Sequence, residues 1–577
     1  MRERLVTPRD VAWMLVLMAL ALAPRLYWAS GIGLSDDFIF RGEVNAVLNK
    51  QILPDNQAYR FSWWFPAALS CRIFGLTELG LILPFTVTAT LAVGLLYLFG
   101  KTLWGRPGGI IAALLLAAYP LDFAWSTMVT TDIVLSFYSA LTMLLVLRAL
   151  AQDDPAWRRR LWALAGVTLW LAYHAKISAL LLIPVVAVAC LANRQRLDRC
   201  ALWFLATAVP LFAFSSLFLY VLTGDPLFPY HSELEFQGLA GPLAKVHAIS
   251  PDVFWYYPQL LFFPDSLGDL VHSVYPHALL LLAAVGIVFG LRSSGVVLGW
   301  LIIVFLGMQL AVLPADGVWI SGFRNIRHLH VVVYPLVLAL TGYLVALRAR
   351  SPLGAVVLLV ALLAFSGWEC VATAQKTQIA FADRRTVCRY LLELPPKPSY
   401  ADQGIVIWCT VLDPTNGPPK VKELPADAPS RKARIATITS GYVVTGGARE
   451  PYYGCPSCIT SASELPAGRW RLVQKFPDLV PPVPWREEAL RVWEAIEPPA
   501  ARGGPQRGRA PVGGFHRMPA HSSGSPTTTA LRTSCASGRT TAPPRPLMIQ
   551  RTRPSVTRER SFTTTRVIPP WLPAGSV

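Results

Sequence analysis

"VAWMLVLMALALAP", residues 11–24, contains no charged residue, and the apolar stretch around it continues to about Ala29 with Arg25 as its only charge. A transmembrane helix needs about 20 mostly apolar residues, so this stretch predicts a membrane span. It is longer than the apolar core of a signal peptide, and no A-x-A cleavage site follows it. We therefore expect this first span to be retained rather than cleaved.

Similar apolar runs recur along the 577 residues, of which 53% are hydrophobic and only 15% charged. Ordinary soluble domains carry about 25% charged residues, so the composition indicates a polytopic membrane protein. The fold class that we predict is mainly α, a transmembrane bundle of about eleven helices. The expected spans are residues 11–29, 79–99, 108–121, 127–148, 161–175, 177–192, 201–222, 277–291, 296–313, 328–347 and 352–371.

The net charge of +18 does not indicate nucleic-acid binding, because of where the charges lie. Residues 498–577 hold 12 Arg against one Glu, and neither Lys nor Asp, while the basic residues of the remaining chain gather in alternate short connections. This is the positive-inside pattern of a membrane protein, and it places the N-terminus in the cytoplasm. The connections 30–78, 122–126, 223–276 and 314–327, and everything after about residue 372, are then extracytoplasmic. The predicted location is the inner (plasma) membrane.

Three domains are predicted: a transmembrane domain of residues 1–371, a small extracytoplasmic α/β domain of residues 372–497, and a disordered tail of residues 498–577. In the second, "QGIVIWCTVL" (403–412) and "ARIATITSGYVVTGG" (433–447) are typical of strands, and "REEALRVWEAI" (486–496) of a closing helix. The tail is rich in Arg, Pro, Thr and Ser without apolar periodicity, which predicts disorder. Because its composition differs so strongly from the rest, we interpret it as a non-native extension without a function.

The chain has nine cysteines, of which Cys388, Cys409, Cys455 and Cys458 fall in the α/β domain. "CPSC" at 455–458 has redox-like or zinc-like spacing, but it is a single pair with no His nearby. A structural disulfide is favoured over a metal site if this domain is extracytoplasmic, and the pairing stays open.

Polar groups gather at the predicted outer face. "GLSDDFIFRGE" (33–43) brings Asp36 and Asp37, and "STMVTTDIVL" brings Asp132 near the outer end of a span. Further charges at that depth are Arg25, Lys176, Arg324, Arg327 and His328.

Each group also has a purely structural interpretation. Ser35 followed by two acids is a good helix start, and Lys176, Arg327 and Arg25 can extend to the membrane interface. Asp132 fits this interpretation less well, because an acid flanked by apolar helix is costly and usually functional.

Acids and cations together at an interface suit a lipid-linked phosphate substrate. The lipid tail stays in the bilayer, Lys and Arg neutralise the phosphate as a leaving group, and a carboxylate deprotonates an incoming hydroxyl. This chemistry is glycosyl transfer from a polyprenyl-phosphate carrier.

Several motifs in order carry a resemblance to a known family over roughly residues 10–350. They are "DDFIFRGEVNAVL" (36–48), the stretch from Arg60 that begins "RFSWWFPAALSCRIFG", "GGIIAALLLAAYPLDFAWSTMVTTDIVL" (108–135), "YHAKISALLLIP" (173–184) and "IRHLHVVVYPLVLAL" (326–340). The chain resembles the GT-C glycosyltransferases, which include the protein O-mannosyltransferases and the bacterial lipid A aminoarabinose and galacturonic acid transferases of glycosyltransferase family 39 and its relatives. It departs from them in "WWFPAAL", where the family has Pro-Pro, and in His328, where the family has Tyr.

The resemblance implies an inverting hexosyl- or pentosyltransferase that uses a polyprenyl-phosphate sugar and a cell-envelope acceptor (lipid, glycan or protein). Asp36 then matches the catalytic aspartate and Asp37 the acid beside it. The implied substrate-binding residues are Arg25, Arg60, Asp132, Lys176, Arg324, Arg327 and His328. No cofactor is required, and a divalent metal is possible but not indicated. The alternative is a transporter or lipid-linked sugar flippase, but such proteins place their functional charges near the bilayer midplane.

Overall fold

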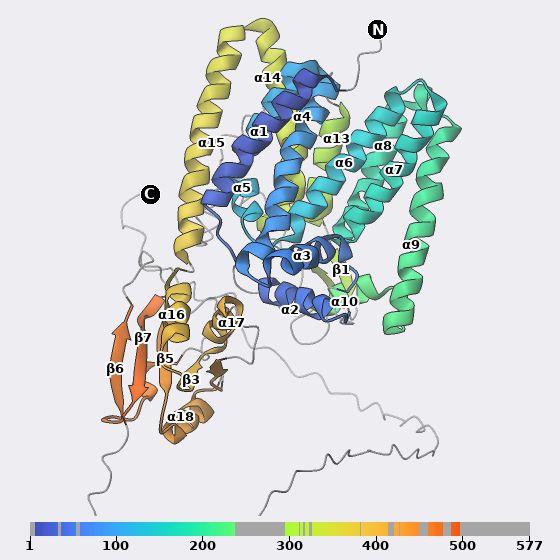
Figure 1. Ribbon diagram of the computed structural model, residues 1–577. Helices are drawn as coiled ribbons and strands as arrows, with labels where there is room; N and C mark the ends of the chain where they lie inside the picture. The colour runs from blue at the N-terminus through green and yellow to red at the C-terminus, as the bar shows by residue number, and fades with distance from the viewer. Residues whose placement is uncertain are drawn as a thin grey trace, which may run out of the picture. The chain divides into compact units, whose positions relative to one another are not determined.

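The computed structural model describes residues 6–32, 36–52, 58–236, 295–310, 312–315, 318–321, 326–380, 382–413, 420–425, 427–448, 460–476 and 486–496. The predicted tail and the expected span 277–291 lie outside these residues. Figure 1 shows a helical bundle and a smaller part that combines helices with a sheet.

The bundle is formed by the elements up to residue 380. In the part of it that the structure describes, these are α-helices, four short 3-10 helices and a short strand pair. Its helices are α1 (Pro8–Tyr27), α2 (Asp36–Leu48), α3 (Phe61–Phe74), α4 (Glu78–Ala117), α5 (Pro120–Ser126), α6 (Thr131–Ala151), α7 (Pro155–Tyr173), η1 (Ile177–Leu181), α8 (Leu182–Ala192), η2 (Arg194–Arg196), η3 (Arg199–Ala201), α9 (Leu202–Thr223), α10 (Phe228–Phe236), α13 (Gly295–Leu310), η7 (Ile326–Leu329), α14 (His330–Arg350) and α15 (Pro352–Ala380). Strands β1 (Val312–Ala315) and β2 (Val318–Ser321) pair antiparallel.

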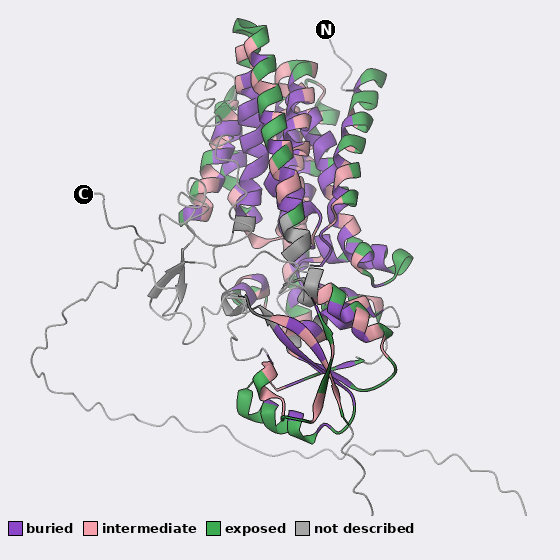
Figure 2. Ribbon diagram, turned by 90° about the vertical axis from the view of Figure 1, so that its left-hand side faces the viewer, coloured by how far each residue is buried: buried purple, intermediate pink, exposed green. Residues whose placement is uncertain are grey.

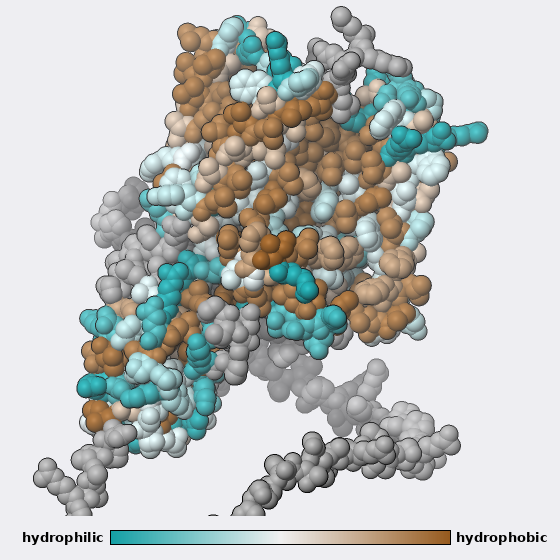
Figure 3. All heavy atoms as spheres, in the orientation of Figure 1, coloured by the Kyte–Doolittle hydropathy of each residue, from teal (hydrophilic) through white to brown (hydrophobic). Residues whose placement is uncertain are grey.

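Six of the described helices are long and apolar enough to cross a membrane: α1, α4, α6, α14, α15 and the segment Arg199–Thr223 that contains α9. Burial separates inner from outer helices. The apolar window of α14 is 78% buried, against 17% for the segment of α9. The outer helices carry many exposed residues (Figure 2). Large apolar side chains are among them, and apolar residues cover much of the bundle surface in Figure 3. The prediction of a polytopic helical membrane protein is confirmed, while the count of eleven stays a prediction.

Helix α4 contains two of the expected spans, 79–99 and 108–121. It breaks at Trp104 and Gly105, where Gly105 has a φ of +73° that favours glycine. A Cβ on Gly100 would lie 2.5 Å from the Gly108 carbonyl oxygen, although residues eight apart in a straight helix are about 12 Å apart. The two arms of α4 therefore fold back on each other as an antiparallel pair.

A buried carboxylate fastens this turn of α4 to the start of α1. Asp10 is fully buried and accepts hydrogen bonds from Lys101 Nζ (2.6 Å), Arg106 Nε (3.1 Å) and Tyr97 Oη (2.8 Å). A buried carboxylate is stable only when it is paired and hydrogen-bonded. We call this end of the bundle, which also has the α6–α7 connection and Arg158–Arg160 at the start of α7, the basic end.

The opposite end is called the site end. Helices α2, α3 and α5 lie there (Figure 1). The chain order adds η1, which follows α7, and η7, which precedes α14. Chain direction alternates between these two ends, so those basic connections and expected site residues that the structure describes lie at opposite ends. Which end faces the cytoplasm stays a prediction.

The described elements of the small part are α16 (Ala382–Glu393), β3 (Ser399–Ala401), α17 (Gln403–Leu412), β4 (Val421–Glu423), α18 (Ala428–Thr437), β5 (Tyr442–Ala448), η9 (Ala462–Glu464), β6 (Trp470–Lys475) and β7 (Arg486–Ala495). The strands form a five-stranded sheet in the order β4-β3-β5-β7-β6, in which β3 runs parallel to β4 and β5, and β7 runs antiparallel to β5 and β6. An α/β composition was expected. The boundary at residue 371 lies inside α15, which continues to Ala380.

Two expected elements of this part have the opposite structure. Residues 403–412 form helix α17 rather than a strand, because Asp402 caps the helix and the buried Ile405, Trp408 and Cys409 recur at helical spacing. Residues 486–495 form strand β7 rather than a helix. There, Leu490 and Val492 alternate into the core between two neighbouring strands, and these tertiary contacts override helix propensity.

The expected strand segment 433–447 divides into two elements. Its first residues complete helix α18, which is capped by Asp427, and only β5 is a strand.

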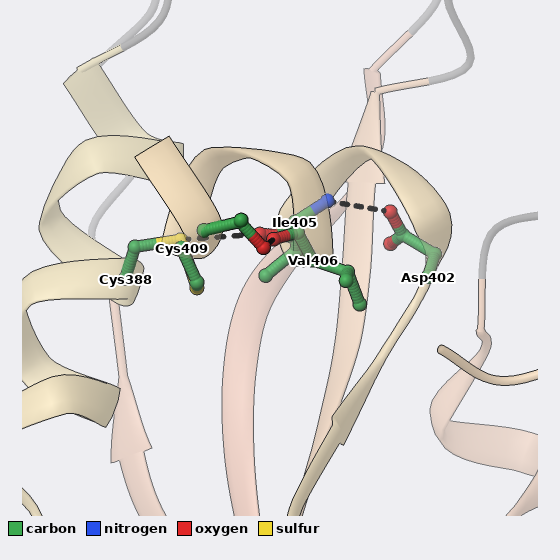
Figure 4. Close-up of a disulfide and its surroundings, with 6 residues drawn as sticks. Cys388, Asp402, Ile405, Val406 and Cys409 are labelled. Carbon is green, nitrogen blue, oxygen red and sulfur yellow. Dashed lines mark hydrogen bonds between the residues drawn. A yellow bond between two sulfur atoms is a disulfide. The ribbon is translucent and has the colours of Figure 1, made fainter. Parts of the chain in front are cut away.

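A disulfide joins α16 to α17 through Cys388 and Cys409 (Figure 4). The two cysteines are 21 residues apart, and both side chains are buried. Cys455 and Cys458 lie outside the described residues.

Removing this disulfide is expected to lower the free energy of unfolding of the small part by about 3 kcal/mol, because the open chain gains conformational entropy. The measurement is limited proteolysis of the full chain after the double substitution Cys388→Ala and Cys409→Ala. Cys200→Ala, at a free cysteine of the basic end, is the control. Cleavage within residues 382–496 at the same rate in all three proteins would contradict the expectation.

Candidate active site

Helix α2 carries the two acids and begins at Asp36. The side chains of Asp36 and Asp37 lie outside what the structure describes, so their roles stay predictions. The helix is anchored by its buried residues Phe40 and Val44, and the rings of Phe40 and Trp63 have centroids 4.5 Å apart. The helix start expected at the acids is therefore present, and it fixes the acids at the site end without excluding catalysis by them.

Asp132 and Lys176, which are 44 residues apart in the sequence, form an ion pair of 2.9 Å between Oδ1 and Nζ. Asp132 lies in the first turn of α6 behind the capping residue Thr130, and Lys176 precedes η1. Their side chains are 3% and 12% exposed. Lys176 is thus directed into the protein toward Asp132 instead of extending to the membrane interface.

Arg60 is also buried and paired. Its Nη2 donates to Glu233 Oε2 of α10 at 2.5 Å, and its Nε donates to Tyr59 Oη at 3.0 Å. Burial raises the pKa of the Tyr59 hydroxyl, which therefore stays protonated. The Tyr59 carbonyl oxygen accepts from His174 Nδ1. Neither Glu233 nor His174 was identified from the sequence, although His174 stands two residues before Lys176.

Arg25 lies in a fully buried network that joins four helices. Its Nη2 donates to Asp122 Oδ2 of α5 at 2.7 Å, and its Nε donates to Ser126 Oγ at 2.9 Å. The other carboxylate oxygen of Asp122 contacts His330 Nε2 at 3.0 Å, and His330 Nδ1 contacts Ser136 Oγ of α6 at 2.7 Å. These contacts give Arg25 protein partners deep in the bundle, and substrate contact by Arg25 stays a prediction. Neither Asp122 nor His330 was identified from the sequence.

The remaining expected cations come just before α14. His328 is 8% exposed and lies in η7. Arg327 belongs to the same turn, but its side chain, like the whole of Arg324, lies outside the described residues. Since His330 is held by Asp122 and Ser136, the start of α14 is fixed beside the starts of α5 and α6.

No group of three or more His, Cys, Asp or Glu side chains among the described residues could hold a metal ion. The described residues of the site end therefore provide paired charges. Lys176 pairs with Asp132, Arg60 pairs with Glu233, and helix α2 begins at an acid. Cations at an interface bind phosphate, and carboxylates accept protons from hydroxyl groups. The arrangement suits phosphate-leaving-group chemistry.

The sequence profile of the Dolichyl-phosphate-mannose-protein mannosyltransferase family matches residues 61–220. No curated protein sequence matches this chain. Among solved structures, ArnT from Cupriavidus metallidurans in the apo state aligns with a TM-score of 0.52 at 14% identity, over 86% of this chain and 99% of that one.

The same protein bound to undecaprenyl phosphate aligns with a TM-score of 0.50 at 15% identity and the same coverage. An oligosaccharyltransferase from Archaeoglobus fulgidus aligns with a TM-score of 0.47 at 14% identity, over 75% of this chain and 68% of that one. The fold of this chain is therefore that of ArnT, and the predicted resemblance to the GT-C glycosyltransferases is confirmed.

Proposed function

We propose that this chain, a membrane protein with the fold of the GT-C glycosyltransferases, transfers a sugar from a polyprenyl-phosphate carrier to a hydroxyl group of a cell-envelope acceptor. The observation that carries the proposal is the position of the family match. It covers residues 61–220, the segment in which Asp132 and Lys176 form their buried pair. ArnT, whose fold this chain has, is a protein crystallised with undecaprenyl phosphate.

In the proposed reaction the acceptor hydroxyl oxygen attacks the anomeric carbon from the side opposite the phosphate. The bond between that carbon and the phosphate oxygen breaks, and the anomeric configuration inverts. Asp36 takes the hydroxyl proton as general base, and polyprenyl phosphate leaves with the bonding electrons. Asp37 orients the acceptor or a donor hydroxyl.

Lys176 and Arg327 are proposed to neutralise the phosphate as charge builds on it. Asp132 holds the ammonium of Lys176 at the site end. A cation with its position fixed in advance stabilises the leaving group without reorganising during the reaction. Arg60, Arg324 and His328 are proposed to complete the donor site, and no step requires a metal.

The test uses the full chain in vesicles with radiolabelled polyprenyl-phosphate pentose, hexose or uronic acid and a lipid extract of the cell envelope. We expect the radioactive label to move from one of these donors to an acceptor lipid. In a strain without the gene, mass spectrometry should show that the cell envelope lacks one sugar. A transporter would instead move the labelled donor between leaflets without breaking the sugar–phosphate bond. That result, with an unchanged envelope, would contradict the proposal.

The proposed location is the inner membrane, with the site end and residues 372–497 outside the cytoplasm. A phosphatase reporter, which is active only outside the cytoplasm, is expected to be active when fused after Glu497 and inactive when fused after Asp153 in the α6–α7 connection. The reason is the gathering of Arg and Lys at the basic end. The opposite pair of activities would show that the bundle is inverted.

A further inference from the structure

Residues 30–32, which lie between α1 and the acids, are held by hydrogen bonds from several directions. Gly31 N donates to the Thr127 carbonyl oxygen at 3.0 Å, and Ile32 N donates to Glu78 Oε1 at 3.2 Å. Thr127 Oγ1 donates to Ser30 Oγ at 3.1 Å. Ser30, Gly31 and Ile32 are all buried. We call residues 30–32 the junction.

An arginine of the small part completes the contacts of the junction. Arg385 of α16 donates from Nε to Glu78 Oε1 at 3.1 Å and from Nη2 to the Ser30 carbonyl oxygen. Its guanidinium lies over the ring of Trp408 of α17, 5.0 Å from the centroid. The side chains of Arg385 and Glu78 are only 14% and 21% exposed. One guanidinium therefore contacts both the junction backbone and the carboxylate that binds it.

The junction leaves no room for a side chain at its centre. Gly31 has a φ of +76°, and a Cβ there would lie 2.5 Å from Glu78 Oε1 and 2.6 Å from Arg385 Nη2. The ion pair thus closes directly over the backbone of a residue whose φ favours glycine, and a side chain there would displace the paired groups. Such a fit fixes the path of the chain five residues before Asp36.

The same pair of helices contacts the chain beyond the acids. Arg41 Nη2 of α2 donates to the Thr410 carbonyl oxygen of α17 at 3.1 Å. Cys388 lies one helical turn after Arg385, and Cys409 is adjacent to Thr410, so the disulfide links the two contact points. The covalently joined α16 and α17 therefore hold the chain on both sides of Asp36 and Asp37.

From these contacts we infer that Arg385 and Glu78 are positioning residues, through which the small part fixes the acid-bearing start of α2. The inference rests on the proposed function for its kinetic consequence. The donor cations come from other segments, so loss of the pair displaces the base but leaves the donor site in place. Misplacing a reacting group by about 1 Å can cost roughly 100-fold in rate. We expect Arg385→Gln to lower kcat by about 10- to 100-fold with an unchanged KM for the donor.

The experiment compares Arg385→Gln, Glu78→Gln and the double variant in the vesicle assay, with Arg385→Lys as the conservative variant. Because both residues act on one junction, the double variant should lose no more than the worse single variant. Arg385→Lys should recover some of the lost kcat. The control variant is Arg471→Gln. Arg471 of β6 pairs with Glu494 of β7 in the sheet of the small part, away from the junction, so this variant should leave kcat unchanged.

Hydrogen exchange of residues 30–48 supplies a second readout that does not depend on activity. It should be faster in Arg385→Gln and in Glu78→Gln than in Arg471→Gln. If the wild-type protein transfers no sugar, the proposed function fails, and the exchange rates alone decide the positioning role. Wild-type exchange in both junction variants, wild-type kcat in both, or an equal loss of kcat in Arg471→Gln would overturn the inference.

Discussion

Replacing Asp36 by asparagine is expected to lower the turnover of sugar transfer by roughly 10²–10⁴-fold, the usual contribution of a positioned general base. Asparagine keeps the shape of the side chain and can still begin a helix, but it cannot take the acceptor proton. Helix α2 begins at this residue, so the variant should retain wild-type thermal stability. Initial rates in the vesicle assay, with the melting temperature as a second measurement, provide the check.

Asp37→Asn is the matched control, because it removes the same charge from the adjacent residue of the same helix turn. We expect a smaller loss of rate, since Asp37 is proposed to orient a substrate hydroxyl and not to accept the proton. Wild-type transfer by Asp36→Asn would leave these acids with the role of starting the helix and would contradict the mechanism. A larger loss in Asp37→Asn would exchange the two roles.

The predicted spans illustrate what a sequence can reveal about a membrane fold. Long apolar runs have to be helices because no other open structure satisfies the backbone in lipid, and α6, α9 and α14 lie close to the expected ranges. The break of α4 at Trp104 and Gly105 falls between the expected spans 79–99 and 108–121, so the sequence also indicated that this segment turns back. The close contacts between Gly100 and Gly108, which bring the two arms together, were not predicted.

The small part shows why short elements are harder to predict. Residues 403–412 are rich in β-branched residues, and residues 486–496 are rich in Glu, Arg and Ala, so local propensity favoured the wrong state in both. The buried positions carried the correct signal: helical spacing from Ile405 to Cys409, and alternation at Leu490 and Val492. Only the neighbouring strands made that alternation decisive.

At the candidate site, the sequence indicated single charges but not their partners. Asp132 and Lys176 were both expected at one membrane depth, and the structure pairs them. Glu233, the partner of Arg60, comes from α10, and Asp122, the partner of Arg25, comes from a segment expected to be a short extracytoplasmic connection. A buried charge requires a partner, so Arg25 within an apolar stretch was a signal that one existed, but not of which residue it was.

The Asp132–Lys176 pair can be divided into a structural and a functional contribution by a double-mutant cycle. Removing one partner of a buried ion pair leaves an uncompensated charge, which costs about 3–5 kcal/mol. Lys176→Met and Asp132→Asn should therefore each lower the melting temperature. The variant with both substitutions has no unpaired charge, and it should recover most of the stability.

Donor binding is expected to behave differently from stability in the same cycle. If Lys176 contacts the donor phosphate, Lys176→Met should raise the donor KM at least about tenfold. A tenfold change corresponds to about 1.4 kcal/mol of binding free energy, which is less than a typical hydrogen bond to a charged group contributes. The double variant still lacks the ammonium, so its donor KM should stay high although its stability returns. Arg158 and Asp198 form an ion pair at the basic end, and Arg158→Met with Asp198→Asn should leave the donor KM unchanged. The proposal would be contradicted if the double variant at Asp132 and Lys176 regained both stability and donor binding. The pair would then only hold α6 against the α7–η1 connection. In that case the phosphate would have to be bound by the cations that precede α14.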